Sequence, residues 1–521
     1  VKSNKIVGLG KIGQEDEYIT PKTKVVLLNK NQMVMPGIHD NHIHLIQAGM
    51  LEKYADLYGS VSQEEAADRV VKFAEKNPHE NWMVGFGWAR MSWTDHSLPK
   101  AKTLDLLFPD RPVLLLDSEL HGAWANGKAF ELCGIDKHTH DPQFGMIARD
   151  EEGNPEGYLY ETALSLVAKH AFEFEEDTLE GLINLYTRRA NQYGITSTSD
   201  MTPYLGINLA YEKIYYKMSR EEKLTVRIHA ARDLFEDIHV YLSVKEEAEK
   251  NDKGFYRVCY TKQFLDGVIT NYTALMLESY WDKQGDCGGA LLDIGKLNEG
   301  VERAHKNGIS VRLHACGDGA VRVALDAFEN AIKKYGQTKA RHQIEHIEVI
   351  AQEDLKRFQK LGVIASVQPE HIVSGIDTFD NNCYPEVLGP DRERYTWAFR
   401  SLLQAGAVLA CGSDAPVVEG NPFMGMYCGL TRLHPDGTPK GGWNPEEKLS
   451  IEELLQGYTF GAAYAEGREE ELGTLEIGKL ADIAVLDRNL LTATPDEVRD
   501  TRVLLTMVDG KIVYDDLVEA L

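Results

Sequence analysis

The sequence predicts an α/β protein built on a (β/α)8 barrel, with a small β-sandwich domain formed by the N- and C-terminal segments. Two observations predict this fold. Between about residues 175 and 420, amphipathic helices, glycines and short apolar strands follow one another in a fixed order, which is typical of a parallel sheet with helical crossovers. On either side of this region, short β segments alternate with polar turns. An open doubly wound sheet is the alternative, although no Gly-x-Gly-x-x-Gly turn follows an early strand.

The repeated unit of the barrel is a helix, a glycine and a strand. Residues 179–193 carry apolar side chains at the 3.6-residue period of a helix, Gly194 ends that helix, and residues 195–198 form the next strand. Enough such units occur to close a barrel of eight strands. Three more have helices at 301–307, 355–361 and 401–405 and strands at 309–313, 363–366 and 407–411.

The chain divides into two predicted domains. Residues 1–33 and 472–521 form the composite β-sandwich, and residues 34–471 form the barrel, with an inserted region at about 53–165. The two ends of the chain are therefore expected to pair with each other.

Both ends contain β segments that favour this pairing. Residues 23–28 have the apolar and β-branched composition of a strand. Near the other end, residues 503–513 contain an Asp509-Gly510 hairpin signal.

Composition excludes several classes of partner. The chain has 81 acidic and 56 basic residues, a net charge of -25, which repels phosphate backbones. It has no run of eighteen apolar residues and no basic-then-apolar signal region. The seven cysteines are scattered and include no Cys-x-x-Cys pair, as in proteins with reduced thiols. We therefore expect a cytoplasmic protein with no nucleic-acid partner and no membrane segment.

The first motif with chemical content is a His-x-His sequence. A Pro36-Gly37 turn leads into an apolar strand that ends in His42 and His44. Side chains two apart on a strand share a face, so the two imidazoles lie side by side. Because neutral imidazole is the commonest metal ligand, the pair supplies half of a metal site. The alternative is two polar residues where a strand becomes a loop.

Three later strands also end in residues that bind metals. His314 follows the strand at 309–313, His346 follows a short strand, and Asp414 follows the strand at 407–411. Reactive side chains of a (β/α)8 barrel stand at the carboxyl ends of its strands. Each residue alone could belong to a loop or cap a helix. Together with the His-x-His pair they favour a site for a borderline cation such as zinc.

These motifs, in this order, resemble the amidohydrolase superfamily, and within it the amidohydrolase 3 (YtcJ-like) family. The resemblance rests on Pro-Gly-x-x-Asp-x-His-x-His at 36–44 and on Gly-Thr-Leu-Glu-x-Gly-Lys-x-Ala-Asp-Ile at 473–483. It runs from about residue 34 to the C-terminus and is specific to the family, not to a substrate. Further motifs of the family stand at 121–129, 262–267, 314–321, 400–403 and 412–417.

The resemblance implies a set of metal ligands. His42 and His44 bind the more buried ion together with Asp414. A second ion, where present, is bound by two further histidines, and a carbamylated lysine bridges the two ions. The alternative is a mononuclear site beside an uncharged or salt-bridged lysine. The residues at these second positions are His314, His346 and Lys262.

The resemblance also implies the reaction. It is the hydrolysis of an amide-type C–N bond, as in an amide, an N-substituted formamide or a cyclic amide. Water activated by a divalent metal attacks the carbonyl, with Asp414 as general base and then general acid. A metal-dependent decarboxylase, lyase or isomerase on the same scaffold is one alternative, since the fold does not fix the reaction. A catalytically silent binding protein is another.

Three residues are candidates for contact with a small-molecule substrate: His121, Trp88 and Gln368. The alternative for His121 is that it anchors the inserted region at the barrel mouth. The alternatives for Trp88 and Gln368 are a place in the core and a structural role. Zinc is the expected metal, with one or two ions per chain, and manganese, iron and cobalt suit the same ligand types. A homodimer is expected from the resemblance alone.

Overall fold

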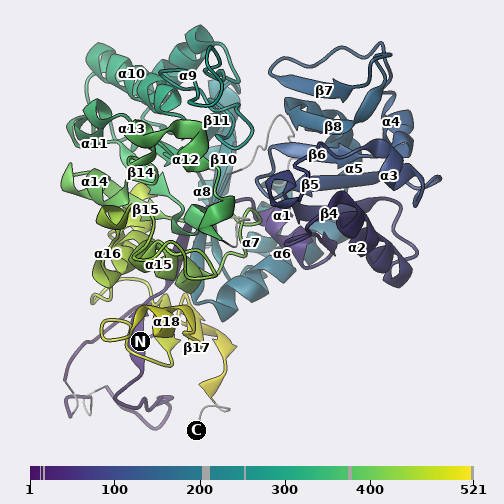
Figure 1. Ribbon diagram of the computed structural model, residues 1–521. Helices are drawn as coiled ribbons and strands as arrows, with labels where there is room; N and C mark the ends of the chain where they lie inside the picture. Colours follow the sequence, from purple (N-terminus) through teal and green to yellow (C-terminus); the bar gives the residue numbers. More distant parts are fainter. Residues whose placement is uncertain (12, 16–17, 202–211, 252–253, 374–377, 518–521) are drawn as a thin grey trace.

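Eight parallel strands form the central barrel of the protein (Figure 1). The computed structural model describes residues 1–11, 13–15, 18–201, 212–251, 254–373 and 378–517. An isolated parallel bridge between Ile43 and Ala415 joins the first strand to the segment after the last one, so the sheet closes. In the order of the sheet, the strands are β2 (Ile38–Ile43), β9 (Ile195–Asp200), β10 (Arg227–Asp233), β11 (Tyr256–Phe264), β12 (Ser310–Ala315), β13 (Gln343–His346), β14 (Ile364–Val367) and β15 (Val408–Cys411).

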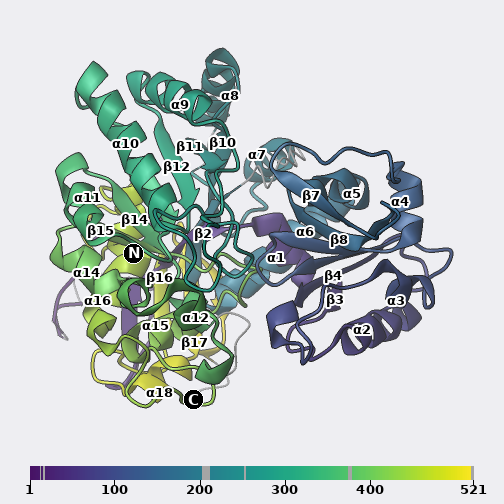
Figure 2. The same cartoon turned by 45° about the horizontal axis from the view of Figure 1, so that its top comes forward.

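Helices connect these strands and cover the outside of the barrel (Figure 2). The glycines predicted to end four of them, Gly194, Gly308, Gly362 and Gly406, have φ of 74°, 66°, 68° and 88°. This left-handed conformation favours glycine, and the predicted helix–glycine–strand order is confirmed. No helix among the described residues is long and apolar enough to cross a membrane. The helices of the barrel include α1 (Leu45–Leu51), α6 (Glu176–Gln192), α7 (Glu212–Arg220), α8 (Ile238–Asn251), α9 (Ile294–Lys306), α10 (Asp318–Tyr335), α11 (Leu355–Leu361), α14 (Phe399–Gln404), α15 (Pro422–Thr431), α16 (Ile451–Gln456) and α17 (Ala462–Ala465).

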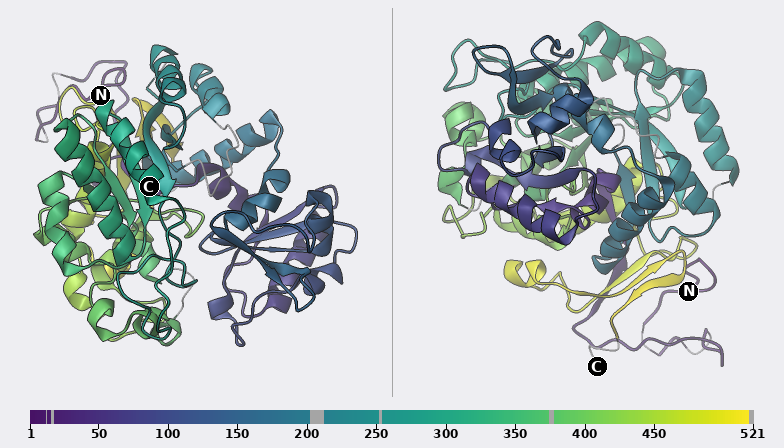
Figure 3. Two further views of the ribbon diagram at one scale, coloured as in Figure 1. Left: turned by 90° about the horizontal axis from the view of Figure 1, so that it is seen from above. Right: turned by 90° about the vertical axis from the view of Figure 1, so that its right-hand side faces the viewer.

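The inserted region between β2 and β9 forms its own mixed sheet, which lies to one side of the barrel (Figure 3). An apolar cluster separate from the barrel core fills it. In the order of the sheet, its strands are β3 (Ala55–Asp56), β4 (Met83–Trp88), β5 (Val113–Asp117), β6 (Gly122–Ala125), β8 (Pro155–Glu161) and β7 (Gly145–Arg149). Its helices are α2 (Gln63–Lys76), α3 (Ala101–Asp105), α4 (Gly127–Cys133) and α5 (Ser165–Ala171).

The two ends of the chain pair, as predicted, in a small antiparallel sheet at the bottom of Figure 1. β1 precedes the barrel, and its partner β16 follows it. Asp509 and Gly510 form the predicted hairpin with φ of 53° and 75°, the two positive angles of a type I′ turn. The strands are β1 (Met33–Pro36), β16 (Ile483–Leu486), β17 (Val503–Val508) and β18 (Lys511–Asp515), and α18 (Pro495–Arg499) precedes β17.

The predicted strand at residues 23–28 differs from the structure. These residues form no strand, and Val25 and Leu27 are 52% and 84% exposed. The first strand of the terminal sheet is instead β1, whose four residues pair with β16. An apolar, β-branched composition favours a strand but does not supply a partner for it.

Candidate metal centre

Two histidines stand side by side at the carboxyl end of β2. His42 and His44 are 0% and 4% exposed, and their ring centroids lie 5.8 Å apart. The Nε2 atom of each ring lies 3.3 Å from Oδ1 of Asp414. The predicted His-x-His pair therefore shares one carboxylate.

Backbone hydrogen bonds bring Asp414 to this pair. Its N–H donates to the carbonyl of His42 at 2.7 Å, and the N–H of His44 donates to the carbonyl of Ala415 at 2.9 Å. Gly412 permits the close approach, because a Cβ there would lie 2.4 Å from the backbone nitrogen of His42. Asp414 itself has a φ of 61°. Such a conformation costs about 1–3 kcal/mol in a residue other than glycine and persists where the surroundings impose it.

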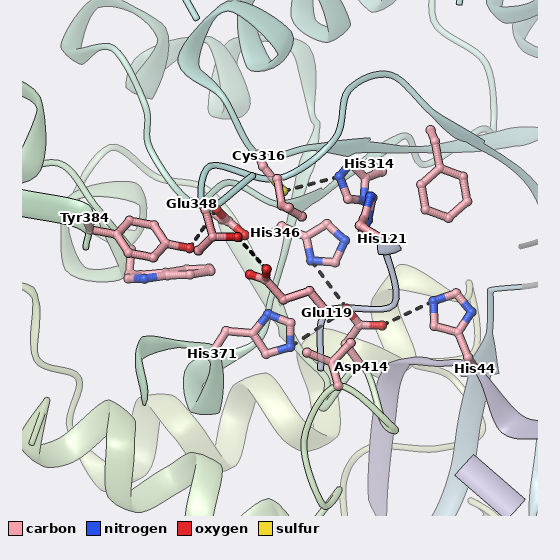
Figure 4. A pocket seen from close by; sticks show the side chains of 15 residues that line it. His44, Glu119, His121, His314, Cys316, His346, Glu348, His371, Tyr384 and Asp414 are labelled. Carbon is pink, nitrogen blue, oxygen red and sulfur yellow. Dashed lines mark hydrogen bonds and ion pairs between the residues drawn. The ribbon is translucent and has the colours of Figure 1, made fainter. Parts of the chain in front are cut away.

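His346 ends β13 and faces the same carboxylate (Figure 4). Its Nδ1 lies 3.8 Å from Oδ2 of Asp414, and its ring centroid lies 4.8 Å from that of His42. One ligand atom from each of these three residues lies within 4.8 Å of the other two. Residues from β2, β13 and the segment after β15 thus converge on one point.

His314 lies beside this group but has other contacts. Its ring centroid is 4.5 Å from that of His346, while its Nε2 lies 3.2 Å from the carbonyl oxygen of Gly267 and 3.3 Å from Sγ of Cys316. Its Nδ1 makes no hydrogen bond within the described part of the chain. Asp266, which groups with His314 and Cys316, already accepts three backbone N–H groups. Only the Nδ1 side of His314 is therefore open to a ligand.

Lys262 stands near the carboxyl end of β11. It is 1% exposed, and its Nζ makes no hydrogen bond among the residues described. Nζ lies 4.8 Å from the ring centroid of Phe264. Burial lowers the pKa of Lys262 to about 8, so its neutral amine is accessible near neutral pH.

Charges within the group are coupled. Burial alone would raise the pKa of Asp414, but the facing imidazoles, His42 first, outweigh it and hold that pKa well below its usual range. Burial lowers the pKa of His44 and of His346. A carboxylate among neutral imidazoles is the ionisation state in which such ligands bind a cation.

A buried ion pair contacts His42 at Nδ1, the ring nitrogen that does not face Asp414. Nδ1 of His42 lies 2.6 Å from Oε2 of Glu345, and Arg312 donates from Nε and Nη2 to the same carboxylate at 2.6 and 3.2 Å. Arg312 also pairs with Glu466 at 3.1 Å. Burial alone would raise the pKa of Glu345, but Arg312 outweighs it and lowers that pKa. Sequence reasoning missed this pair, because a charged residue within a strand gives no signal of its partner.

A pocket with about 600 Å³ of empty volume opens beside these residues (Figure 4). Its wall includes Glu119, from the turn after β5, and Glu348, two residues after β13. Thr270 donates to Glu119, and the hydroxyl of Tyr384 donates to Glu348 at 2.9 Å. The sequence analysis missed all four residues. Only the two glutamates carry a signal, because each lies two residues from a predicted histidine. The other lining residues are His44, His121, Phe264, Val268, His314, Cys316, His346, His371, Trp397, Asp414 and Val417.

His121 lines the pocket and is also anchored. Its Nδ1 lies 2.6 Å from Oε2 of Glu161, at the end of β8 in the inserted region. Burial alone would lower the pKa of His121, but Glu161 outweighs it and raises that pKa to about 9. The ring is therefore an imidazolium at neutral pH, so the substrate-contact and anchoring interpretations are compatible.

His371 follows β14 in the 3₁₀ helix Pro369–Val373. Its Nε2 lies 3.8 Å from Oδ2 of Asp414, and burial lowers its pKa to about 4. The sequence analysis did not place it among the candidate site residues, although it lines the pocket.

Two of the residues predicted to contact substrate lie elsewhere. Trp88 is 1% exposed, its ring centroid lies 5.2 Å from that of Trp93, and its Nε1 donates to the carbonyl of Leu115. It belongs to the core of the inserted region and does not line the pocket. Gln368 is fully buried directly after β14 and is also outside that lining. Of the alternatives weighed for Trp88, the place in the core agrees with this structure. A sequence does not reveal which way the side chain of either residue points.

The residues present fit a divalent cation. Nε2 of His42 and Oδ1 of Asp414 are buried, and neither makes a hydrogen bond among the described residues. Buried polar atoms normally have partners, so two such atoms 3.3 Å apart indicate a group that belongs between them. Imidazole and carboxylate together suit zinc and similar ions.

A closed barrel of eight parallel strands with histidines and an aspartate at their carboxyl ends defines the class of (β/α)8 metal-dependent hydrolases. The particular family follows from comparison with known proteins. Residues 30–514 match the amidohydrolase family, and the chain belongs to that family, as the sequence motifs predicted.

Three relatives extend over most of the chain. It is 30% identical to Protein LONG AFTER FAR-RED 3 of Arabidopsis thaliana, over 99% of this chain and 88% of that protein. It is 27% identical to the putative amidohydrolase YtcJ of Bacillus subtilis, over 96% and 92%. It is 26% identical to an N-substituted formamide deformylase of Arthrobacter pascens, over 94% and 90%.

Solved structures share the architecture. An uncharacterized metal-dependent hydrolase from Pyrococcus horikoshii has a TM-score of 0.70 and 26% identity, over 89% of this chain and 88% of that one. A variant of the atrazine chlorohydrolase TrzN from Arthrobacter aurescens, solved with zinc, has a TM-score of 0.52 at 16% identity, over 99% and 90%. The second likeness shows a common fold alone.

Proposed function

We propose that this protein hydrolyses an amide-type C–N bond of a small molecule, such as an amide, an N-substituted formamide or a cyclic amide. The observation that carries the proposal is the convergence of His42, His44 and His346 on the carboxylate of Asp414. The relation to an N-substituted formamide deformylase supports the type of bond.

We assign the metal, with zinc as the first choice, to His42, His44 and Asp414. His346 lies close enough to share that ion or to bind a second one, with His314 through Nδ1 and a carbamylated Lys262. One ion gives a mononuclear enzyme, and two give a dinuclear one. When bound, the cation supplies a Lewis acid and lowers the pKa of water toward neutrality.

The chain's own residues handle protons and substrate charge. Oδ1 of Asp414 faces two imidazoles, whereas Oδ2 faces His346 and His371. We assign to Oδ2 the transfer of a proton from the attacking water to the leaving nitrogen. His121, held as an imidazolium, donates to the carbonyl oxygen and stabilises the negative charge that develops there. Water adds across the bond, which breaks to give a carboxylic acid and an amine.

The remaining assignments concern the setting of the enzyme. The net charge of -25 supports a small-molecule substrate rather than a nucleic acid. Seven free cysteines support a reducing, cytoplasmic location. A homodimer is proposed from the family resemblance alone.

The test is product analysis in water enriched in ¹⁸O. Metal-loaded protein is incubated with linear amides, N-substituted formamides and cyclic amides. The expected products are an amine and a carboxylic acid that carries one ¹⁸O atom. Carbon dioxide, or an isomer without ¹⁸O, would instead indicate the decarboxylase, lyase or isomerase alternative. Purified protein that binds no metal and hydrolyses none of these compounds would instead support the alternative of a catalytically silent binding protein.

A further inference from the structure

Two glutamates in the pocket wall, Glu119 and Glu348, have no lysine or arginine partner among the described residues. Glu348 is 4% exposed, and its hydrogen bond from Tyr384 is neutral. Glu119 likewise accepts from a neutral hydroxyl, that of Thr270. No lysine or arginine is among the lining residues within the described part of the chain. Burying carboxylates close together without a cation is unfavourable, so this wall suits a ligand that brings positive charge.

The positive groups nearest this wall are already engaged. Burial raises the pKa of Glu119, and Arg90 offsets only a small part of that rise. The Nη1 of Arg90 donates to the backbone carbonyl of His96 at 3.4 Å. The imidazolium of His121 is paired with Glu161 at 2.6 Å. Burial, and then the nearby Glu119, raise the pKa of Glu348 to about 7. Among the described residues neither Arg90 nor His121 forms an ion pair with Glu119 or Glu348, so a cationic ligand would be the partner that favours their carboxylate forms.

A second observation, independent of the glutamates, also indicates a ligand with N–H donors. The side chain of His371 is 8% exposed, and its Nε2 makes no hydrogen bond among the residues described. The ring also hydrogen-bonds the backbone of Ser413, as the donor. In the neutral ring that donor is the other nitrogen, and Nε2 is an acceptor. Nε2 faces Oδ2 of Asp414 at 3.8 Å, and two facing acceptors require a donor between them.

Aromatic side chains complete the wall. Phe264, Tyr384 and Trp397 line the pocket together with the two glutamates. Figure 4 shows the ring of Tyr384 next to Glu348 and the side chain of Glu119 extending into the same space. Aromatic rings beside carboxylates suit an organic cation, which gains from both.

We propose that this pocket selects substrates whose amine portion carries a cationic nitrogen group, an ammonium, amidinium or guanidinium, bound by Glu119 and Glu348. The inference rests on the proposed function, because it places the carbonyl at Asp414 and the cationic portion at the glutamates. His371 accepts a hydrogen bond from the N–H of the bond to be broken or from the attacking water.

The test measures binding of benzamidine, a planar aromatic cation, against its neutral isostere benzamide. Isothermal titration uses the metal-loaded wild-type protein and the variants Glu119→Gln and Glu348→Gln. We expect benzamidine to bind wild type about 10-fold or more tightly than benzamide, the difference that one charge-assisted contact supplies. Each variant should lose most of that preference while its affinity for benzamide stays within about 2-fold.

Glu447→Gln is the matched control. Glu447 is as buried as Glu348, at 4% exposure, and it accepts from Ser401 away from the pocket. This variant should keep the preference for benzamidine. Melting temperatures of all three variants show whether a loss of binding follows from a loss of folding.

Two results would overturn the inference. One is that benzamidine does not bind, or binds no more tightly than benzamide. The same holds if both Glu119→Gln and Glu348→Gln keep the preference for benzamidine. The other is an additional equivalent of divalent metal that Glu119→Gln or Glu348→Gln removes, because the wall would then be a metal site. The ¹⁸O assay and the metal content of the same preparation separate the two proposals. An active, metal-containing enzyme without the preference contradicts only the inference, whereas an inactive, metal-free one contradicts the proposed function.

Discussion

Nδ1 of His42 and Oε2 of Glu345 lie 2.6 Å apart, and both residues are fully buried. Because Glu345 is held as a carboxylate by Arg312, it can only accept, so Nδ1 of His42 donates this hydrogen bond. This hydrogen bond leaves the lone pair of Nε2 directed at Asp414. Such outer partners fix the tautomer and orientation of a metal-binding histidine.

Glu345→Gln should therefore weaken metal binding by about 10- to 100-fold. The amide cannot accept the Nδ1 proton as strongly as a carboxylate does, and the lone pair of Nε2 is then less well oriented. Competition with a fluorescent chelator measures the affinity directly, without a substrate.

Glu466→Gln is the control for this prediction. Glu466 pairs with the same Arg312 and is equally buried, with both side chains at 0% exposure, but it contacts no candidate ligand. It should change stability without changing metal affinity. Equal losses in the two variants would show that the network acts only on folding.

The pair of His121 and Glu161 should set the alkaline limb of activity. The pKa of His121 is raised above its unfolded value, to about 9, by Glu161. The charged ring, and the stability it contributes, is therefore present below pH 6.5 and lost as pH rises through about 9. We expect kcat/KM to fall above that pH, and Glu161→Gln to move the fall toward neutrality. An alkaline limb that Glu161→Gln leaves in place would contradict the role of His121.

A buried histidine pair should make the fold sensitive to acid. Nδ1 of His342 accepts from the N–H of Val311, so its Nε2 donates to Nδ1 of His305 at 2.9 Å. Burial lowers the pKa of His342 to about 3. Between pH 6.5 and 3 the unfolded chain binds a proton that the folded chain excludes. The free energy of unfolding therefore decreases as the pH is lowered, by about 1.4 kcal/mol per pH unit.

His342→Gln should flatten this dependence by one proton. Urea unfolding at pH 7 and pH 5 measures the free energy of unfolding of both proteins. An unchanged difference between the two pH values would show that other groups account for the acid sensitivity.

The terminal sheet should depend on one buried ion pair with the barrel. Arg227, at the start of β10 and 1% exposed, donates to Asp482 at 2.7 and 3.0 Å and to Asp509 at 2.9 Å. Asp482→Asn should destabilise the protein by about 3–5 kcal/mol, because it leaves a buried guanidinium poorly paired. The exposed pair of Lys24 and Asp515 offers the contrast, and Asp515→Asn should cost less than about 1 kcal/mol in urea unfolding.

The sequence predicted the parts of the site that have a fixed place in the fold. His42, His44, His346 and Asp414 lie at or just beyond the carboxyl ends of barrel strands, and the fold brings those ends together. The glycine after each helix likewise predicted the sheet, because it marks where a strand begins.

The rest depended on contacts between segments distant in sequence. Glu119 comes from the inserted region and Glu348 from a barrel loop, and no periodicity relates them. Arg312 and Glu345 are charged residues inside strands, which a pattern of apolar residues does not predict. Trp88 has the composition of a pocket residue but packs in a core, because composition does not determine which cluster an aromatic ring joins.

The most direct test of the account is the metal content per chain, measured by elemental analysis on protein purified without chelator. We predict one or two equivalents of zinc or a similar divalent ion, and their loss in His42→Asn but not in the exposed control His138→Asn. Two equivalents would support the dinuclear site with Lys262, and one would support the mononuclear site. Protein that contains no metal, and recovers none when metal is added back, would contradict the account and leave only the barrel.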